Sequence, residues 1–341
     1  MKILAIESTC DETAAAVVEN CGSGVKVISN VIASSVLIHQ KYGGIVPEVA
    51  AREQVQSIIP VITESISGVK DDVQAVAVSY GPGLMGSLLV GVETAKALAW
   101  AWKKPLYSVN HMAAHVFANW IVNDRKMEVP QFPALGLVVS GGHTDLIFMK
   151  NLRDWEWIGG TRDDAVGEAF DKVARLLGFA YPGGPEIQKA SEKVTADQKE
   201  KSVFKLPRPL LRDSSLEMSF SGLKAAVSRE VSEIVNIDDI TKNIIAWEFL
   251  EAISDILIMK TMMAVERYKP KSVLIAGGVA ANTTLRKRLG KTVETVAGVK
   301  FFCPELKYCG DNAAMVGAVA ILAPNEVSIK DLKPEPGLAT V

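Results

Sequence analysis

The chain has 341 residues, of which 48% are hydrophobic and 22% are charged, and its formal net charge is −2. Chains longer than about 250–300 residues usually divide their core, so we expect a compact globular protein of two domains. The near-neutral charge argues against a free-standing nucleic-acid binder, which usually has a basic surface, but nucleic acid bound through a local patch or a partner stays open.

The compartment is expected to be the cytoplasm. Met1 and Lys2 lead directly into a strand-like run, which is not the pattern of a signal peptide. No window approaches the roughly 20 apolar residues of a membrane span, so no membrane association is expected. The cysteines lack Cys-x-x-Cys spacing and are expected to be free thiols, with a redox or metal role for the first as the alternative. They are Cys10, Cys21, Cys303 and Cys309.

Hydrophobic periodicity predicts a first α/β domain over residues 1–130. A polar turn at 7–13 separates its first two strands. Strands are predicted at 3–6, 14–19, 25–35, 73–79 and 105–109, and helices at 46–65, at 87–102 and from His111 onward. Polar, proline-flanked residues from Asn123 to Pro133 then predict a domain junction.

The opening pattern returns after this junction, which predicts a second, duplicated domain over residues 131–310. A buried strand at 135–139, a polar turn at 140–144 and a return strand at 145–150 repeat the start of the chain, and a third strand follows at 155–160. The later elements are a helix at 163–177, a tight turn at 181–185, a solvated and mobile polar insertion at about 188–213, a helix at 240–268, a strand at 272–276 and a helix from 283. A last helix, at about 311–325, is expected to pack back on the first domain.

Two of the chain's four histidines, His111 and His115, lie four residues apart. On an α-helix this spacing places both imidazoles on one face, about 6 Å apart along the axis. Two neutral imidazoles can begin a Zn, Fe, Ni or Mn site, and the third ligand must come from elsewhere. Asp311 is a candidate, although a helix N-cap is an equally suitable role for it. The alternative for the pair is two surface histidines without a metal.

Glycine pairs follow two of the predicted strands, at Gly141-Gly142 and Gly277-Gly278. Glycine lets backbone N–H groups approach a phosphate, which favours a nucleotide site, while a tight strand-to-helix turn is the alternative. Neither pair has Walker A or Gly-x-Gly-x-x-Gly spacing.

Acidic residues gather at two further places. Asp11 and Glu12 in the first turn could hold a cation or act as a base, or simply form a hairpin turn. Asp163, Asp164 and Asp171 are predicted on one helical stretch. There Asp171 could accept hydrogen bonds from a ribose, and an exposed acidic face is the alternative.

Short motifs then follow one another in a distinctive order. They are Ile6-Glu-Ser-Thr-Cys-Asp-Glu-Thr13, Tyr42-Gly-Gly-Ile-Val-Pro-Glu48, Gly81-Pro-Gly-Leu84, His111-x-x-x-His115, Val139-Ser-Gly-Gly-His-Thr144, Gly167-Glu-Ala-Phe-Asp-Lys172, Tyr181-Pro-Gly-Gly-Pro185, Ser219-Phe-Ser-Gly-Leu-Lys224, Gly277-Gly-Val-Ala-Ala-Asn282 and Asp311-Asn-Ala-Ala314. This order closely resembles the TsaD family of tRNA N6-adenosine threonylcarbamoyltransferases, once labelled O-sialoglycoprotein endopeptidases. The Tyr42–Glu48 run is similar to the bacterial and organellar branch.

The resemblance implies an actin/Hsp70-like (ASKHA) fold of two duplicated RNase H-like domains with a cleft between them. It implies transfer of a threonylcarbamoyl group from threonylcarbamoyl-AMP to N6 of adenosine 37, forming t6A in tRNAs that read codons beginning with A. No residue is an obvious nucleophile, so direct transfer is the expected mechanism. The protease label is disfavoured, because Met112 stands where a His-Glu-x-x-His helix needs Glu and no convincing Ser-His-Asp set is present.

Site residues are also implied by the match of motifs. His111, His115 and Asp311 would ligate one divalent metal per chain, Fe²⁺ or Zn²⁺, and Asp11 or Glu12 would lie near the reacting phosphate. Contacts to the adenylate would come from Val138, Val139, Ser140, Gly141, Gly142, Asp171, Gly184 and Asn282, and ATP or ADP would occupy the same cleft. One further family position, often Asp, is Gln188 here, which puts the ribose contact at that position in doubt.

Partners implied by the resemblance are the tRNA anticodon loop, a TsaB paralogue that forms a heterodimer, and the TsaE ATPase. We expect the paralogue to dock on apolar helices within about residues 35–105. Two other functions stay open on the same fold, because fold does not fix function. A small-molecule kinase or ATPase would not need the histidine pair, and a non-catalytic nucleotide-binding scaffold would not modify tRNA.

Overall fold

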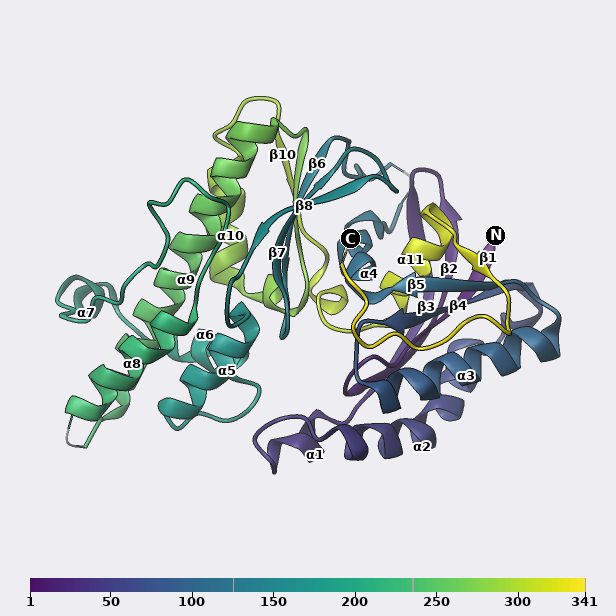
Figure 1. Cartoon of the computed structure of the whole chain (residues 1–341), viewed down its shortest axis with the longest axis horizontal. Helices are drawn as coiled ribbons and strands as arrows, with labels where there is room; N and C mark the ends of the chain where they lie inside the picture. Colours follow the sequence, from purple (N-terminus) through teal and green to yellow (C-terminus); the bar gives the residue numbers. More distant parts are fainter. Residues whose placement is uncertain (125, 235, 341) are drawn as a thin grey trace. The chain divides into compact units, whose positions relative to one another are not determined.

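The computed structural model describes residues 1–124, 126–234 and 236–340, which form two compact units (Figure 1). Unit 1 comprises Met1–Pro130, Leu152–Asp154 and Pro304–Val341. Unit 2 comprises Gln131–Asn151 and Trp155–Cys303. The C-terminal segment therefore returns to the N-terminal unit.

Unit 1 is built on a six-stranded sheet with the order β11-β5-β4-β1-β2-β3. Its first three strands, β1 (Lys2–Glu7), β2 (Glu12–Cys21) and β3 (Gly24–Ser34), form an antiparallel meander. β4 (Val73–Gly81) runs parallel to β1, and β5 (Leu106–Asn110) runs parallel to β4. β11 (Glu326–Val327) pairs antiparallel with β5 and closes the edge.

Helices cover both faces of this sheet. α2 (Pro47–Ser65) and α3 (Met85–Trp102) lie on one face, and α11 (Ala313–Leu322) lies on the other, beside α4 (His111–Phe117) (Figure 1). The short α1 (Val36–Gln40), the 3₁₀ segments η1 (Lys70–Asp72), η2 (Ala118–Trp120) and η4 (Leu306–Tyr308) complete the unit.

The core of unit 1 is formed by alternate residues of the strands, whose side chains point to the same face of the sheet. Leu4 and Ile6 on β1 are fully buried and pack with Ile58 and Ile62 of α2 and with Val92 of α3. Burying each such side chain stabilises the fold by about 1.5–3 kcal/mol. Apolar residues four apart on α2 thus meet every second residue of the strand, which is the pattern that predicted both elements.

Unit 2 repeats the strand order of unit 1 in the sheet β10-β9-β6-β7-β8. β6 (Ala134–Val139), β7 (Thr144–Met149) and β8 (Trp155–Gly160) form the meander, β9 (Ser272–Ala276) runs parallel to β6, and β10 (Lys300–Phe302) runs parallel to β9. β6 to β10 therefore occupy the places of β1 to β5. The duplicated meander expected from the sequence is confirmed.

The helices of unit 2 depart from the sequence prediction at several boundaries. They are α5 (Val166–Leu176), α6 (Gly183–Glu192), α7 (Ala196–Glu200), α8 (Ser221–Glu233), α9 (Asp239–Tyr268), the 3₁₀ segment η3 (Gly278–Ala281) and α10 (Thr283–Val293). The end of α6 and all of α7 lie within the stretch 188–213, for which a solvated insertion was expected, and α8 was not predicted. The part of the chain that the structure describes contains no helix long and apolar enough to cross a membrane.

The prediction that Asp163, Asp164 and Asp171 share one helix is wrong, because α5 begins at Val166. Asp163 instead accepts hydrogen bonds from the N–H groups of Phe220 and Ser221 at the start of α8. Its carboxylate therefore stabilises the N-terminus of another helix, where a negative charge is favourable.

Close packing of α11 on the sheet gives a stability prediction. A Cβ added to Gly317 would lie 2.5 Å from Cγ2 of Val18, so Gly317→Ala forces α11 away from β2. We expect a loss of about 1–3 kcal/mol in the free energy of unfolding by urea denaturation. Gly184→Ala, at a helical glycine with open space around its Cα, is the control and should not destabilise the protein. Equal stability of both variants would contradict this packing.

Candidate metal centre and nucleotide-facing loops

α4 begins directly after β5, and this places the histidine pair. The side chain of Asn110 caps the helix by accepting hydrogen bonds from Met112 N at 2.8 Å and Ala113 N at 3.2 Å. His111 and His115 consequently lie one turn apart on the same face, with ring centroids 4.7 Å apart. Both are buried. The alternative of two surface histidines is wrong.

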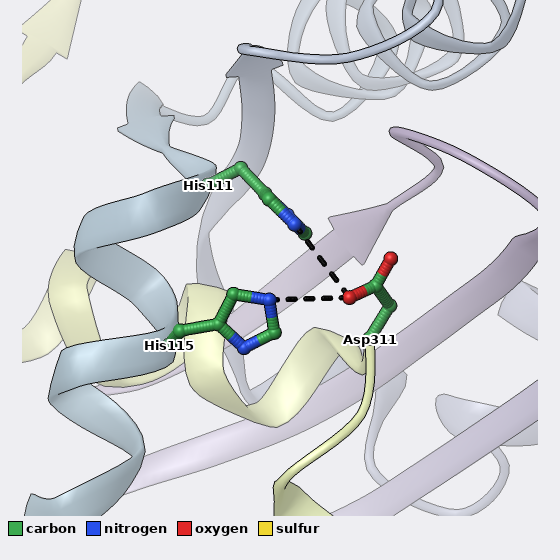
Figure 2. Close-up of side chains that lie close together, drawn as sticks. All are labelled: His111, His115 and Asp311. Carbon is green, nitrogen blue, oxygen red and sulfur yellow. Dashed lines mark ion pairs between the residues drawn. The ribbon is translucent and has the colours of Figure 1, made fainter. Parts of the chain in front are cut away.

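Asp311 completes a cluster with the two imidazoles (Figure 2). Its Oδ1 lies 3.2 Å from Nε2 of His115 and 3.6 Å from Nε2 of His111. Asn312, not Asp311, caps α11, since its side chain accepts a hydrogen bond from Met315 N. The capping role considered for Asp311 is therefore wrong, and its carboxylate is available to the histidines.

Glu7, which the sequence analysis did not select, supports His111 from the opposite side. Its Oε2 lies 3.0 Å from Nδ1 of His111 and accepts a hydrogen bond from Ser79, and its Oε1 accepts one from Thr9 N. A carboxylate at Nδ1 favours the proton on that nitrogen and leaves Nε2 free to bind a metal. A lone glutamate ending a buried apolar strand was the only signal in the sequence.

Electrostatics in the cluster are dominated by buried carboxylates. Burial disfavours the imidazolium, but Glu7 and Asp311 outweigh it and raise the pKa of His111 to about 9. Burial opposes ionisation of Asp311, yet the two histidines lower its pKa to about 2. Burial, Asp311 and Asp11 together raise the pKa of Glu12 to about 10. A cation would relieve this concentration of negative charge.

Two imidazole nitrogens and one carboxylate oxygen, all within 4.8 Å of one another, fit a divalent transition metal such as Zn²⁺ or Fe²⁺. Asp11 and Glu12 were selected as candidate catalytic carboxylates. Asp11 lies in the turn between β1 and β2, and Glu12, the first residue of β2, interacts electrostatically with Asp311 and with Asp11.

The loops of unit 2 bring together several residues expected at the adenylate. Val138 and Val139 are buried at the end of β6, and the turn Ser140–Gly142 follows. The carbonyl of Ser140 accepts a hydrogen bond from Gly167 N, which joins the turn to α5. Gly277 has φ +90°, and a Cβ there would lie 2.4 Å from Val139 O, so the loop after β9 presses against the end of β6.

The other expected adenylate residues join neighbouring helices within unit 2. Asp171 accepts a hydrogen bond from Gly183 N at 2.7 Å, next to Gly184. Gln188 accepts one from Thr283 N at 3.1 Å, and Asn282 caps α10. A Cβ added at Gly141, Gly142 or Gly184 would have no atom within 4 Å, so the backbone there is open to a ligand.

Solved structures show the fold class of this chain. Full-length HypF in its phosphate- and nucleotide-bound form has a TM-score of 0.58 and 12% identity over 94% of this chain. HypF of T. kodakarensis has a TM-score of 0.59 and 14% identity over 93% of this chain. This chain spans about half of each, 54% and 46% respectively. At such identities the likeness shows the fold alone, and it confirms the expected actin/Hsp70-like fold.

Comparison with known sequences then identifies the family. The TsaD profile, described as tRNA N6-adenosine threonylcarbamoyltransferase, matches residues 26–318. The protein of that name from Moorella thermoacetica is 46% identical over 327 residues, covering 93% of this chain and 90% of the relative. The one from Bacillus subtilis strain 168 is 45% identical over 345 residues, covering 99% and 95%. The chain belongs to the TsaD family, as its motifs indicated, and is a transferase.

The raised pKa of His111 predicts how metal affinity depends on pH. Because a protonated imidazole cannot ligate, apparent Zn²⁺ affinity should rise about tenfold per pH unit from pH 6.5 toward 9. Competition with a chromophoric chelator measures it. His111→Ala with His115→Ala should abolish binding, whereas His143→Ala, outside the cluster, should retain one ion per chain. Unchanged metal content in the double variant would rule out this site.

Proposed function

We propose that this chain transfers the threonylcarbamoyl group of threonylcarbamoyl-AMP to N6 of adenosine 37, forming t6A in tRNAs that read codons beginning with A. The family match over residues 26–318 carries the proposal. The buried cluster of His111, His115 and Asp311 supports it, since a sugar kinase or simple ATPase of the same fold has no need of such a ligand set.

The transfer is an acyl substitution on a mixed anhydride. The N6 amine attacks the carbamoyl carbon, the bond to the phosphate oxygen breaks, AMP leaves, and N6 loses a proton. An adenine amine is a poor nucleophile, so positioning of both reactants supplies much of the rate. Bound Fe²⁺ or Zn²⁺ would act as a Lewis acid toward a carbonyl or phosphoryl oxygen.

Residues of unit 2 are proposed to hold the adenylate. Backbone N–H groups of the open turn Ser140–Gly142 suit a phosphate. Asp171, Gly184 and Asn282 would contact the nucleoside, and ATP or ADP would use the same residues. Gln188 already binds Thr283 N, so it would act by fixing α6 to the start of α10 instead of contacting the ribose through a carboxylate.

Asp11 or Glu12 is proposed to act near the reacting phosphate. Burial and the neighbouring carboxylates of Asp311 and Asp11 raise the pKa of Glu12 to about 10, which favours its protonated form. A bound cation would lower this pKa and let Glu12 serve as a proton acceptor.

The acceptor is proposed to be the tRNA anticodon loop, in which bases are reachable without melting a helix. With a net charge of −2, affinity for tRNA would depend on local Lys and Arg residues and on partner subunits. A TsaB paralogue and the TsaE ATPase are the proposed partners, and the proposed compartment is the cytoplasm.

The reaction is tested by mass spectrometry of nucleosides from tRNA incubated with this chain, threonylcarbamoyl-AMP and the partner subunits. Asp171→Asn retains an acceptor for Gly183 N but loses the charge, and Asp171→Ala loses both. We expect Asp171→Ala to weaken adenylate binding about tenfold in calorimetry, or ~1.4 kcal/mol, and to leave tRNA binding intact. Asp197→Ala, on the exposed α7, is the control. Absence of t6A with the complete mixture would refute the function.

The paralogue is proposed to dock on α2 and α3. Val55 and Ile59 of α2 are 63% and 57% exposed, and Met85 and Leu89 of α3 are 51% and 42% exposed. Exposed apolar patches of this kind usually mark interfaces.

Because Val55 is exposed, Val55→Glu should leave the fold, metal binding and adenylate binding unchanged and break the heterodimer on size exclusion. The loss of affinity should be at least about tenfold. Gln56→Glu, at the next exposed position of α2, adds the same charge and serves as the control, expected to weaken pairing less. A folded Val55→Glu chain that pairs normally would exclude this surface.

A further inference from the structure

The backbone of residues 8–12, which we call the metal-side turn, is held through its carbonyl groups. It joins β1 to β2 and carries Asp11 and Glu12. Three of its carbonyl oxygens accept hydrogen bonds from residues at the start of α3 and between β3 and α1: Thr9 O from Leu84 N at 2.8 Å, Cys10 O from Ser87 Oγ at 3.0 Å, and Asp11 O from Ser35 Oγ at 2.8 Å.

One side chain, Gln54 of α2, contacts this turn at three points. Its Nε2 lies 3.2 Å from Ser8 O, 3.0 Å from Cys10 O and 3.1 Å from Glu12 O. The residue is buried, with 1% of its surface exposed. Gln54 therefore links the first, middle and last carbonyls of the turn to one helix.

The chemistry of the contact requires an amide donor. Three converging carbonyl oxygens are acceptors only, so the NH₂ group of Gln54 must face them. Its Oε1 is buried and has no hydrogen-bond partner among the described residues. The two hydrogens of the NH₂ group are shared among the three carbonyl oxygens, and these contacts offset the cost of about 1–3 kcal/mol for the unpartnered buried acceptor.

The metal-side turn also contacts Glu7 and His111 through Thr9. Thr9 donates its N–H to Oε1 of Glu7 at 2.7 Å, and its Oγ1 lies 3.2 Å from Nδ1 of His111. A shift of the turn would therefore change how Glu7 and Thr9 orient the His111 ring.

We propose that Gln54 is a positioning residue for the metal centre: its amide fixes the metal-side turn, and the turn fixes Glu7 and His111. The hydrogen bonds that Gln54 donates within the described chain go to the backbone of the metal-side turn and not to His111, His115 or Asp311. Gln54 can act at this distance because protein interiors are close-packed. A turn held at three of its carbonyl groups then has one stable position and not several.

The same helix presents Val55 and Ile59 on its exposed side. If the partner docks there, a step that rests on the proposed function, the partner would restrain α2 and, through Gln54, the metal-side turn. Docking would then tighten the metal centre without any contact between partner and metal.

The test uses the full chain with Zn²⁺ as the probe. Gln54→Met has similar length but no donor, and Gln56→Met changes the same residue type at an exposed position of the same helix. We expect Gln54→Met to weaken Zn²⁺ binding at least about tenfold in chelator competition, or ~1.4 kcal/mol. It should also speed hydrogen exchange of the amides in residues 8–12, while exchange in unit 2 stays unchanged. Gln56→Met should match the wild type in both measurements.

Two further variants separate positioning from general destabilisation. Gln54→Glu directs a carboxylate at three carbonyl oxygens, and none of these groups can donate a hydrogen bond. Zn²⁺ affinity should therefore fall below that of the wild type. The difference should be smaller at low pH, where the protonated carboxyl can donate. Ser87→Ala removes one donor to Cys10 O and should give a smaller effect of the same sign, which decides the question if Gln54→Met does not fold. The proposal would be overturned if folded Gln54→Met bound Zn²⁺ and exchanged its amide hydrogens as the wild type does. If Gln54→Met does not fold, the same result in Ser87→Ala would overturn it.

Hydrogen exchange also tests whether docking of the partner on α2 restrains the metal-side turn. Added partner should slow exchange of residues 8–12 in the wild type and not in Gln54→Met, although both bind it. Equal slowing in both would overturn the coupling. Failure of the partner to bind the wild-type chain would remove the coupling together with the proposed docking surface, and the Gln54 assignment would still be decided by the measurements on the chain alone.

Discussion

The buried carboxylate of Glu7 is the constraint on which the candidate metal centre depends. A carboxylate without solvent is costly unless its oxygens are fully hydrogen-bonded and opposed by a positive group. Glu7 meets this condition only when β1, β4 and α4 are in register, because its partners are Thr9 N, Ser79 Oγ and Nδ1 of His111. The interaction that satisfies Glu7 therefore also orients His111, a candidate metal ligand.

Strand topology explains why these groups meet. β1, β4 and β5 are parallel, and Glu7, Ser79 and His111 lie at or just beyond their carboxyl ends. Loops at the carboxyl ends of parallel strands are the usual place for ligands in α/β sheets. Unit 2 follows the same rule, since Ser140 follows β6 and Gly277 follows β9. The two sheets thus carry chemically different residues at corresponding edges.

Specialisation of the two edges follows from the residues placed there. The edge of unit 1 has imidazoles and carboxylates, which suit a hard or borderline cation. The edge of unit 2 has glycines with open space around them, which suit a phosphate approached by backbone N–H groups. Both kinds of group agree with the proposed transfer from an adenylate.

The sequence by itself determined what local periodicity and spacing control. It predicted the meanders, the helix from 46 to 65, and a histidine pair on one helical face, because these depend on residues within two or three turns of each other. Tertiary structure alone decided that Asp311 reaches the histidines, that Asp163 hydrogen-bonds the start of α8, that Glu7 contacts His111, and that Gln54 holds the turn at residues 8–12. These roles arise from contacts between residues more than 40 positions apart, which no local pattern encodes.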